Sequence, residues 1–217
     1  MSIVSPSILS ADFSIIHEEV EKMVSSGASF IHLDVMDGKF VPAKTFDASL
    51  LDKIKDIKVI KDTHLMVVSP FKEIEEFSKA GADIITVHVE AFSNKEEVDN
   101  ALDLIKSNKV KCGLSLKPNT NVADVVPFLD KVDLVLVMSV EPGKGGQAFL
   151  PSSLDKISFF ANYKKEHNLN YLIEVDGGIN NDTAILTRKA GVDVLVAGSY
   201  LYGHDDYKER LKGLLEL

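Results

Sequence analysis

The sequence predicts an α/β protein with the (β/α)8 TIM barrel fold, a closed ring of eight parallel strands surrounded by helices. Eight short apolar runs recur at nearly regular intervals along the 217 residues, and amphipathic stretches separate them. No proline-, serine- or charge-rich linker divides the chain, so we expect one domain over residues 1–217. An open doubly wound sheet is the alternative, but the GxGxxG turn of that fold does not follow the first apolar run.

The expected strands are β-branched and apolar on both faces, as in IITV, LVLVM and VLVA. This pattern is typical of parallel strands that helices cover. In chain order the strands span Ile3–Ile8, Phe30–Val35, Val59–Leu65, Ile84–Val87, Lys111–Leu116, Leu134–Met138, Tyr171–Val175 and Val194–Ala197.

Amphipathic stretches between the strands predict helices over residues 13–26, 70–80, 94–107 and 151–166. Several helices begin near side chains that can accept a hydrogen bond from the first free backbone N–H groups. These candidate caps are Asp12 or Ser14, Ser69, Ser93 or Asn94, and Asn181 or Asp182.

A weak internal repeat supports the barrel. The segments SGASFIHLD, AGADIITVH and AGVDVLVAG each place a helix-ending glycine just before a strand, at Gly27, Gly81 and Gly191. The first two glycines lie 54 positions apart, which corresponds to two βα units of about 27 residues each. Eight such units fit the length of the chain.

Composition excludes several classes of protein. The chain has 24 basic and 33 acidic side chains and a net charge of -9, which disfavours nucleic acid and anionic membranes as partners. Cys112 is the only cysteine, so a disulfide framework is excluded and a reducing compartment is expected. No apolar run approaches the roughly 20 residues of a membrane span, and the first residues are not basic. We therefore expect a cytoplasmic protein.

The second expected strand, FIHLDV, places polar groups inside the barrel. Because side chains alternate along a strand, His32 and Asp34 share one face and the apolar residues share the other. The apolar face should meet the helices, which turns His32 and Asp34 toward the lumen. A carboxylate there costs several kcal/mol to desolvate unless a cation or metal pairs with it. A hydrogen-bonded core histidine beside a capping aspartate is the alternative for this strand alone.

Two further strands bring polar side chains to the same rim. His64 lies near the end of the third strand, and the seventh strand carries Glu174 and Asp176 on one face, with Asp176 at the tip. His64 alone would be read as a buried core histidine. Two imidazoles and two carboxylates together form a suitable ligand set for a divalent metal ion, and they belong to His32, Asp34, His64 and Asp176. Zn²⁺ is the ion that this set favours most, and Fe²⁺, Mn²⁺ or Co²⁺ are also compatible with it.

Three glycine-containing loops predict a phosphate site. The loop after the sixth strand is Glu141–Phe149, the loop after the seventh contains Gly177-Gly178, and the loop after the eighth contains Gly198-Ser199. Glycine lets backbone N–H groups approach an oxyanion closely, and the last two loops of a barrel form its usual phosphate site. A tight turn explains any one glycine pair, but three neighbouring loops favour a phosphate cradle.

Other residues at the strand ends have two interpretations. Met36, Met66 and Met138 lie on the lumen side by alternation, where they either fill the core or form a dry ceiling over a reactive intermediate. Ser7 either bonds a ligand or caps the next helix. His88 is either a ligand-binding residue or an ordinary loop histidine.

The motifs SILSAD, HLDVMDGKFVP, HLMV, HVE, MSVEPGKGGQAF, VDGGI and VAGS, in this order, resemble the ribulose-phosphate 3-epimerase family over nearly the whole chain. The resemblance implies an isomerase of the pentose phosphate pathway that interconverts D-ribulose 5-phosphate and D-xylulose 5-phosphate. It also implies a homo-oligomer that binds a small sugar phosphate, and one divalent metal ion per subunit, most often zinc or iron.

The resemblance also implies roles for individual residues. The metal ligands are His32, Asp34, His64 and Asp176, and Asp34 and Asp176 form the catalytic acid–base pair. The substrate site contains Ser7, His64, His88, Met36, Met66 and Met138. The phosphate-binding residues are Gly143, Gly145, Gly146, Gln147, Gly177, Gly178, Gly198 and Ser199. Inversion at C3 needs proton transfer on both faces of an enediolate, which two aspartates on separate strands could provide.

Three positions depart from the family pattern. Ala43 stands where the family usually has asparagine, Lys144 replaces an aromatic residue, and Tyr200 is bulkier than usual. Pentulose phosphate is the expected substrate, and a D-allulose-6-phosphate 3-epimerase is the nearest alternative. A metal-free barrel isomerase or lyase and a non-catalytic phosphosugar-binding barrel are further alternatives.

Overall fold

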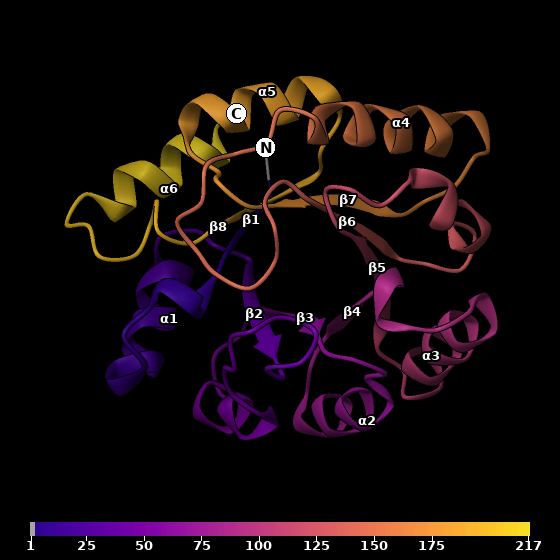
Figure 1. Ribbon diagram of the computed structural model, residues 1–217. Helices are drawn as coiled ribbons and strands as arrows, with labels where there is room; N and C mark the ends of the chain where they lie inside the picture. The colour runs from indigo at the N-terminus through magenta and orange to yellow at the C-terminus, as the bar shows by residue number, and fades with distance from the viewer. Residues whose placement is uncertain (1–2) are drawn as a thin grey trace.

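The computed structural model describes residues 3–217 and shows a ring of parallel strands with helices outside it (Figure 1). The strands are β1 (Ile3–Pro6), β2 (Phe30–Met36), β3 (Ile60–Met66), β4 (Ile84–His88), β5 (Lys111–Leu116), β6 (Leu134–Met138), β7 (Leu172–Asp176) and β8 (Val194–Ala197). From β2 to β8 each strand pairs in parallel with the next in the chain, and β8 pairs with β1. A parallel bridge between Ser7 and His32 joins β1 to β2 and closes the ring. The predicted single-domain (β/α)8 barrel is confirmed.

The helices alternate with the strands. They are α1 (Ile16–Ser25), α2 (Phe71–Ala80), α3 (Lys95–Ser107), α4 (Ser153–Glu166), α5 (Asn181–Ala190) and α6 (Tyr207–Leu215). Short 3-10 turns lie at η1 (Ile8–Ser10), η2 (Phe13–Ile15), η3 (Ala48–Lys53), η4 (Val89–Ala91), η5 (Val122–Asp124) and η6 (Val126–Phe128). The connections after β2 and β5 contain 3-10 turns in place of an α-helix. In the second of these, Pro127 lacks an N–H group and the neighbouring valines restrict helical rotamers.

The strand boundaries differ from the sequence prediction by one or two residues, mostly at the carboxyl ends of the strands. The first strand ends at Pro6 and not at Ile8, because the Ser7 side chain accepts from the Leu9 N–H and starts η1. Four strands run one residue further than expected, to Met36, Met66, His88 and Asp176. The third and seventh strands begin one residue later than expected.

The predicted caps are confirmed in part. Asn94 caps α3 by accepting from the Glu97 N–H, whereas Asp12 caps η2 ahead of α1. Ser69 does not cap α2: its φ is +49° and Pro70 occupies the N-cap position without a side-chain bond. The cap of α5 is Asn180, one residue earlier than expected, and it forms a reciprocal capping box with Thr183.

Two apolar regions hold the barrel together. The main core lies between the outer faces of the strands and the helices, and it includes Ile31, Leu33 and Val35 of β2. A second apolar cluster lies in the lumen: Phe30 and Val194 belong to it at the starts of their strands, and it extends along β6 to Met138. The polar side chains of the lumen are thus confined to its middle and to the carboxyl ends of the strands. Within residues 3–217, no helix combines the length and the apolar character that crossing a membrane requires.

Candidate active site

Four polar side chains from three strands meet at the carboxyl end of the barrel. His32 and Asp34 come from β2, His64 from β3 and Asp176 from β7, and one ligand atom of each lies within 4.8 Å of the others. The Asp34 Oδ1 atom lies 3.5 Å from His32 Nε2 and 3.2 Å from His64 Nδ1. Both histidines are fully buried, and Asp34 is 3% exposed. The convergence predicted from strand alternation is therefore present.

This donor set could hold one divalent metal ion. Two imidazoles and two carboxylates are the ligands that zinc and similar borderline ions bind. The Asp176 carboxylate accepts no hydrogen bond from any residue in the described part of the chain, residues 3–217. Burial and the nearby charge of Asp34 raise the pKa of Asp176 to about 7. A positive ion would supply the compensation that this carboxylate lacks.

The other three members of the cluster have pKa values that are shifted in different directions. Burial disfavours the charged forms of both His32 and Asp34. The charges of Asp62 and Asp34 nevertheless raise the pKa of His32, and the imidazoles of His32 and His64 lower the pKa of Asp34. Burial lowers the pKa of His64 to about 4, so this imidazole is neutral near neutral pH. Asp34 is therefore ionised under conditions in which Asp176 is partly protonated.

A second set of carboxylates lies just below the first. The Asp62 Oδ2 atom is 2.6 Å from His32 Nδ1, and Glu174 Oε1 is 3.8 Å from the same nitrogen. Both carboxylates are fully buried, and burial raises the pKa of Glu174 well above its usual range. The sequence reasoning did not identify Asp62. The signal was available, because Asp62 lies two positions before His64 and so shares its face of β3.

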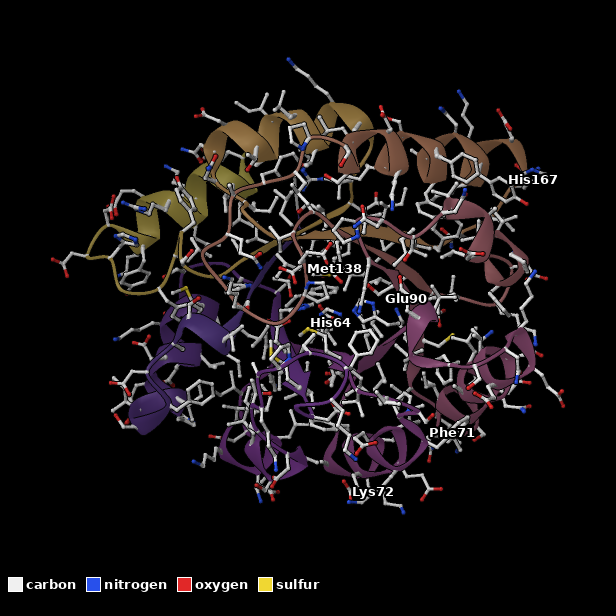
Figure 2. All side chains as sticks on the ribbon, in the orientation of Figure 1. His64, Phe71, Lys72, Glu90, Met138 and His167 are labelled. Carbon is white, nitrogen blue, oxygen red and sulfur yellow. The ribbon has the colours of Figure 1, made fainter. Side chains whose placement is uncertain are left out.

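His88 lies behind His64 and not against the open space of the site. Its Nε2 atom is 2.8 Å from His64 Nε2, and its Nδ1 atom is 3.0 Å from Glu90 Oε2. The Phe40 ring packs against His88 with a centroid separation of 4.8 Å. Figure 2 shows His64 and Glu90 near the centre of the ring, whereas Phe71 and Lys72 lie at the periphery. Phe40 and Glu90 were not identified from the sequence.

A cavity opens above the four converging side chains. Ser7, Asp34 and Asp176 line it, and so do the three predicted methionines, Met36, Met66 and Met138. All eight predicted phosphate-binding residues also line it: Gly143, Gly145, Gly146, Gln147, Gly177, Gly178, Gly198 and Ser199. His32, His64 and His88 are not among the described residues that line it.

Local contacts shape the rim of this cavity. The Ser7 hydroxyl accepts from the Leu9 N–H, as the capping interpretation of Ser7 predicts, and it donates to Asp34 Oδ2 at 2.6 Å. The Gln147 amide donates to the carbonyl oxygens of Glu141 and Lys144, which folds the loop after β6 back on itself. Gly178 has a φ of +64°, and a Cβ there would lie 2.5 Å from the Phe149 nitrogen.

The three departures from the family pattern lie in different places. Lys144 lines the cavity, and it is the only lysine or arginine among the described residues that do so. Ala43 packs against the cluster formed by Met36, Val41 and Met66. Tyr200 does not line the cavity and instead packs under the Arg210 guanidinium, 5.0 Å from the ring centroid.

The family model and the curated relatives that match this chain name the same family of enzymes. A model of the ribulose-phosphate 3 epimerase family matches residues 3–202. The Bacillus subtilis (strain 168) ribulose-phosphate 3-epimerase is 43% identical over 210 residues, covering 96% of this chain and 95% of its own. The chloroplastic ribulose-5-phosphate-3-epimerase of Arabidopsis thaliana is 43% identical over 213 residues, or 98% of this chain and 75% of its own.

Solved structures show a likeness of fold. A 3-hexulose-6-phosphate synthase aligns with a TM-score of 0.68 at 19% identity, covering 99% of this chain and 98% of that one. The 3-keto-L-gulonate-6-phosphate decarboxylase of Vibrio cholerae aligns with a TM-score of 0.71 at 13% identity, covering 99% and 95%.

Proposed function

The chain belongs to the ribulose-phosphate 3-epimerase family and is a carbohydrate-phosphate epimerase, and we propose that it interconverts D-ribulose 5-phosphate and D-xylulose 5-phosphate. One observation carries the proposal. The two aspartates and the glycine loops line a single cavity, so an acid–base pair and a phosphate cradle face the same small substrate.

The two aspartates are suited to opposite halves of a proton transfer. Epimerisation removes the C3 proton on one face of the sugar and returns a proton to the other, and one carboxylate cannot reach both faces. Without a metal ion, Asp34 is ionised whereas the pKa of Asp176 is raised to about 7, so the two carboxylates hold a proton with different strength. We assign Asp34 to one face and Asp176 to the other, with the roles exchanged in the reverse reaction.

Other residues orient the acid–base pair and would hold the metal. The Ser7 hydroxyl donates to Asp34 Oδ2 and so restricts the rotation of this carboxylate. One divalent ion would be bound by His32, Asp34, His64 and Asp176. Zn²⁺ is the ion that best matches these donor atoms. When bound, the ion would stabilise negative charge on the oxygens of the enediolate.

The remaining lining residues would bind and enclose the sugar phosphate. Backbone N–H groups in the loops after β6, β7 and β8 provide donors for the phosphate without adding formal charge. Met36, Met66 and Met138 provide an apolar surface next to the carboxylates. This surface would exclude water and so protect the intermediate from adventitious protonation. We also infer a homo-oligomer, which light scattering of the purified protein would test.

Exchange at C3 tests the proposed reaction directly. The purified, metal-loaded protein is incubated with D-ribulose 5-phosphate in deuterium oxide, and the sugar is analysed by NMR. We expect deuterium at C3 together with D-xylulose 5-phosphate, and loss of both after treatment with a chelator. Unchanged activity in the chelator would favour a metal-free mechanism. A higher kcat/KM on D-allulose 6-phosphate than on D-ribulose 5-phosphate would assign the enzyme to the six-carbon sugar.

A further inference from the structure

Each histidine of the candidate metal site has its second nitrogen in a buried hydrogen bond. His32 Nδ1 lies 2.6 Å from Asp62 Oδ2. His64 Nε2 lies 2.8 Å from His88 Nε2, and His88 Nδ1 lies 3.0 Å from Glu90 Oε2. All three imidazoles are fully buried. The site is therefore supported from behind by one direct and one relayed carboxylate.

When both imidazoles are neutral, one arrangement of protons satisfies both hydrogen bonds that join Glu90, His88 and His64. The ionised Glu90 carboxylate accepts but cannot donate, so the proton of His88 lies on Nδ1. The Nε2 atom of His88 then accepts, and the facing Nε2 atom of His64 must donate. The lone pair of His64 is consequently on Nδ1, the atom that lies 3.2 Å from Asp34 Oδ1 in the metal site.

The position of Glu90 is itself set by another loop. Its Oε1 atom accepts from the Lys117 N–H at 2.7 Å and also from the Thr120 hydroxyl. The Lys156 ammonium of α4 donates to the carbonyl oxygens of both Lys117 and Thr120. The loop after β5 thus holds Oε1, and Oε2 is left to face His88.

We propose that Glu90 is a positioning residue that acts through His88: it holds His64 in the tautomer whose Nδ1 lone pair faces the metal site. This inference rests on the proposed metal site, and it gives a function to a carboxylate that does not line the cavity. Partners of this kind, outside the ligand shell, commonly contribute ten- to hundredfold to metal affinity.

The variant Glu90→Gln tests the relay because it retains the shape of the side chain. The Lys117 N–H can only donate, so it selects the amide oxygen and turns the NH2 group toward His88. His88 must then accept at Nδ1 and donate from Nε2, which forces a proton onto His64 Nδ1. We expect Zn²⁺ to bind about 10- to 100-fold more weakly in competition with a chromophoric chelator. The matched control is Glu97→Gln, because Glu97 also accepts from a backbone N–H but lies on α3.

A second measurement uses the unaltered protein. Nitrogen-15 NMR of the histidine rings in the metal-free enzyme should show His88 protonated at Nδ1 and His64 protonated at Nε2. The opposite tautomers would overturn the proposal, and so would a Zn²⁺ affinity of the folded Glu90→Gln protein within twofold of the unaltered protein. A purely structural role would lower the melting temperature and leave Zn²⁺ affinity and tautomers unchanged. Neither readout requires turnover, so failure of the C3 exchange assay would refute the proposed reaction alone.

Discussion

Asp34 and Asp176 are the same residue type in contrasting environments, and this contrast defines the site at the scale of single residues. Asp34 accepts from Ser7 and lies against two imidazoles, so its carboxylate is stabilised in the ionised form. Asp176 is desolvated without a hydrogen-bond donor among the described residues, so its pKa rises to about 7. In the metal-free protein the two carboxylates therefore have well separated pKa values.

Replacing either aspartate should stop turnover. The variants Asp34→Asn and Asp176→Asn each lose a group that takes part in proton transfer, and we expect kcat to fall by at least about 10²- to 10⁴-fold. The measurement is steady-state epimerisation with metal content determined on the same sample. Asp12→Asn is the control, because asparagine caps a helical turn as well as aspartate does. Near-native kcat of either active-site variant with metal bound would disprove the assignment of two bases.

Lys144 should affect substrate binding more than chemistry. It is the only described lysine or arginine that lines a cavity also lined by three carboxylates, those of Asp34, Glu141 and Asp176. For Lys144→Met we expect KM to rise by about three- to fivefold with kcat nearly unchanged, since an exposed charge pair contributes less than about 1 kcal/mol. The rise should shrink in high salt. A KM equal to that of the unaltered enzyme at low salt would show that Lys144 is only a solvated loop residue.

The acidic and imidazole side chains of the site that could be predicted from the sequence lie in or at the ends of strands. Alternation with a period of two residues places His32, Asp34, His64 and Asp176 inside the barrel, and the same rule applies to Asp62. Glu90 lies in η4, just beyond the end of β4, where alternation no longer determines the direction of a side chain. Its hydrogen bonds to the loop after β5 depend on packing that a single sequence does not encode locally.

At the scale of elements, the loop after β6 and the loop after β7 form one packed unit. Gly178 approaches the Phe149 backbone so closely that only a residue without Cβ fits, and the Ser139 hydroxyl donates to the carbonyl oxygens of Asp176 and Gly177. The glycine pattern predicted the location of these loops. The mutual packing could not be predicted, because it depends on backbone contacts between residues far apart in the chain.

Gly178→Ala should disturb this loop unit. A Cβ would lie 2.5 Å from the Phe149 nitrogen at a φ of +64°, so the loop after β6 must move. We expect a higher KM for the sugar phosphate and a loss of roughly 1–2 kcal/mol or more in unfolding free energy. Gly203→Ala is the matched control, because Gly203 has a φ of +78° but nothing within 4 Å of the added Cβ. If the two variants had the same KM, displacement of the loop would be disproved.

The regular alternation of strands and helices was readable because each helix needs an apolar face against the sheet. The connections after β2 and β5 were less regular, since they contain 3-10 turns that bury few residues. The caps were the least reliable prediction. Several adjacent polar residues can cap a helix equally well, and the approach of the preceding strand selects among them, as Asn180 shows for α5.

At the scale of the whole molecule, the net charge of -9 does not exclude an anionic ligand. The described lining of the cavity combines backbone donors, one lysine and a cluster that could hold a divalent ion. Attraction of a sugar phosphate is therefore local, while the rest of the surface can remain acidic. The same arrangement concentrates buried carboxylates in the lumen, and this concentration should make the stability of the metal-free protein depend on pH.

Asp176 determines the sign of that dependence above about pH 6.5. Its pKa rises from 3.8 in the unfolded chain to about 7 in the folded protein, so the folded state binds this proton more tightly. The stability that the group contributes is complete below the lower value and is lost as the pH rises through about 7. His32 and Glu174, with their raised pKa values, act in the same direction, whereas the lowered pKa values of His64 and His88 act mainly below about pH 6.5.

We therefore expect the melting temperature of the chelator-treated protein to fall between about pH 6.5 and about pH 8.5. Asp176→Asn should reduce this fall, because the amide has no proton to lose. Added Zn²⁺ requires the ionised carboxylate, so its stabilising effect should grow over the same interval. Calorimetric scans of both proteins, with chelator and with Zn²⁺, provide the comparison. A melting temperature of the chelator-treated protein that rises with pH, or that falls equally in Asp176→Asn, would show that Asp176 is not the group responsible.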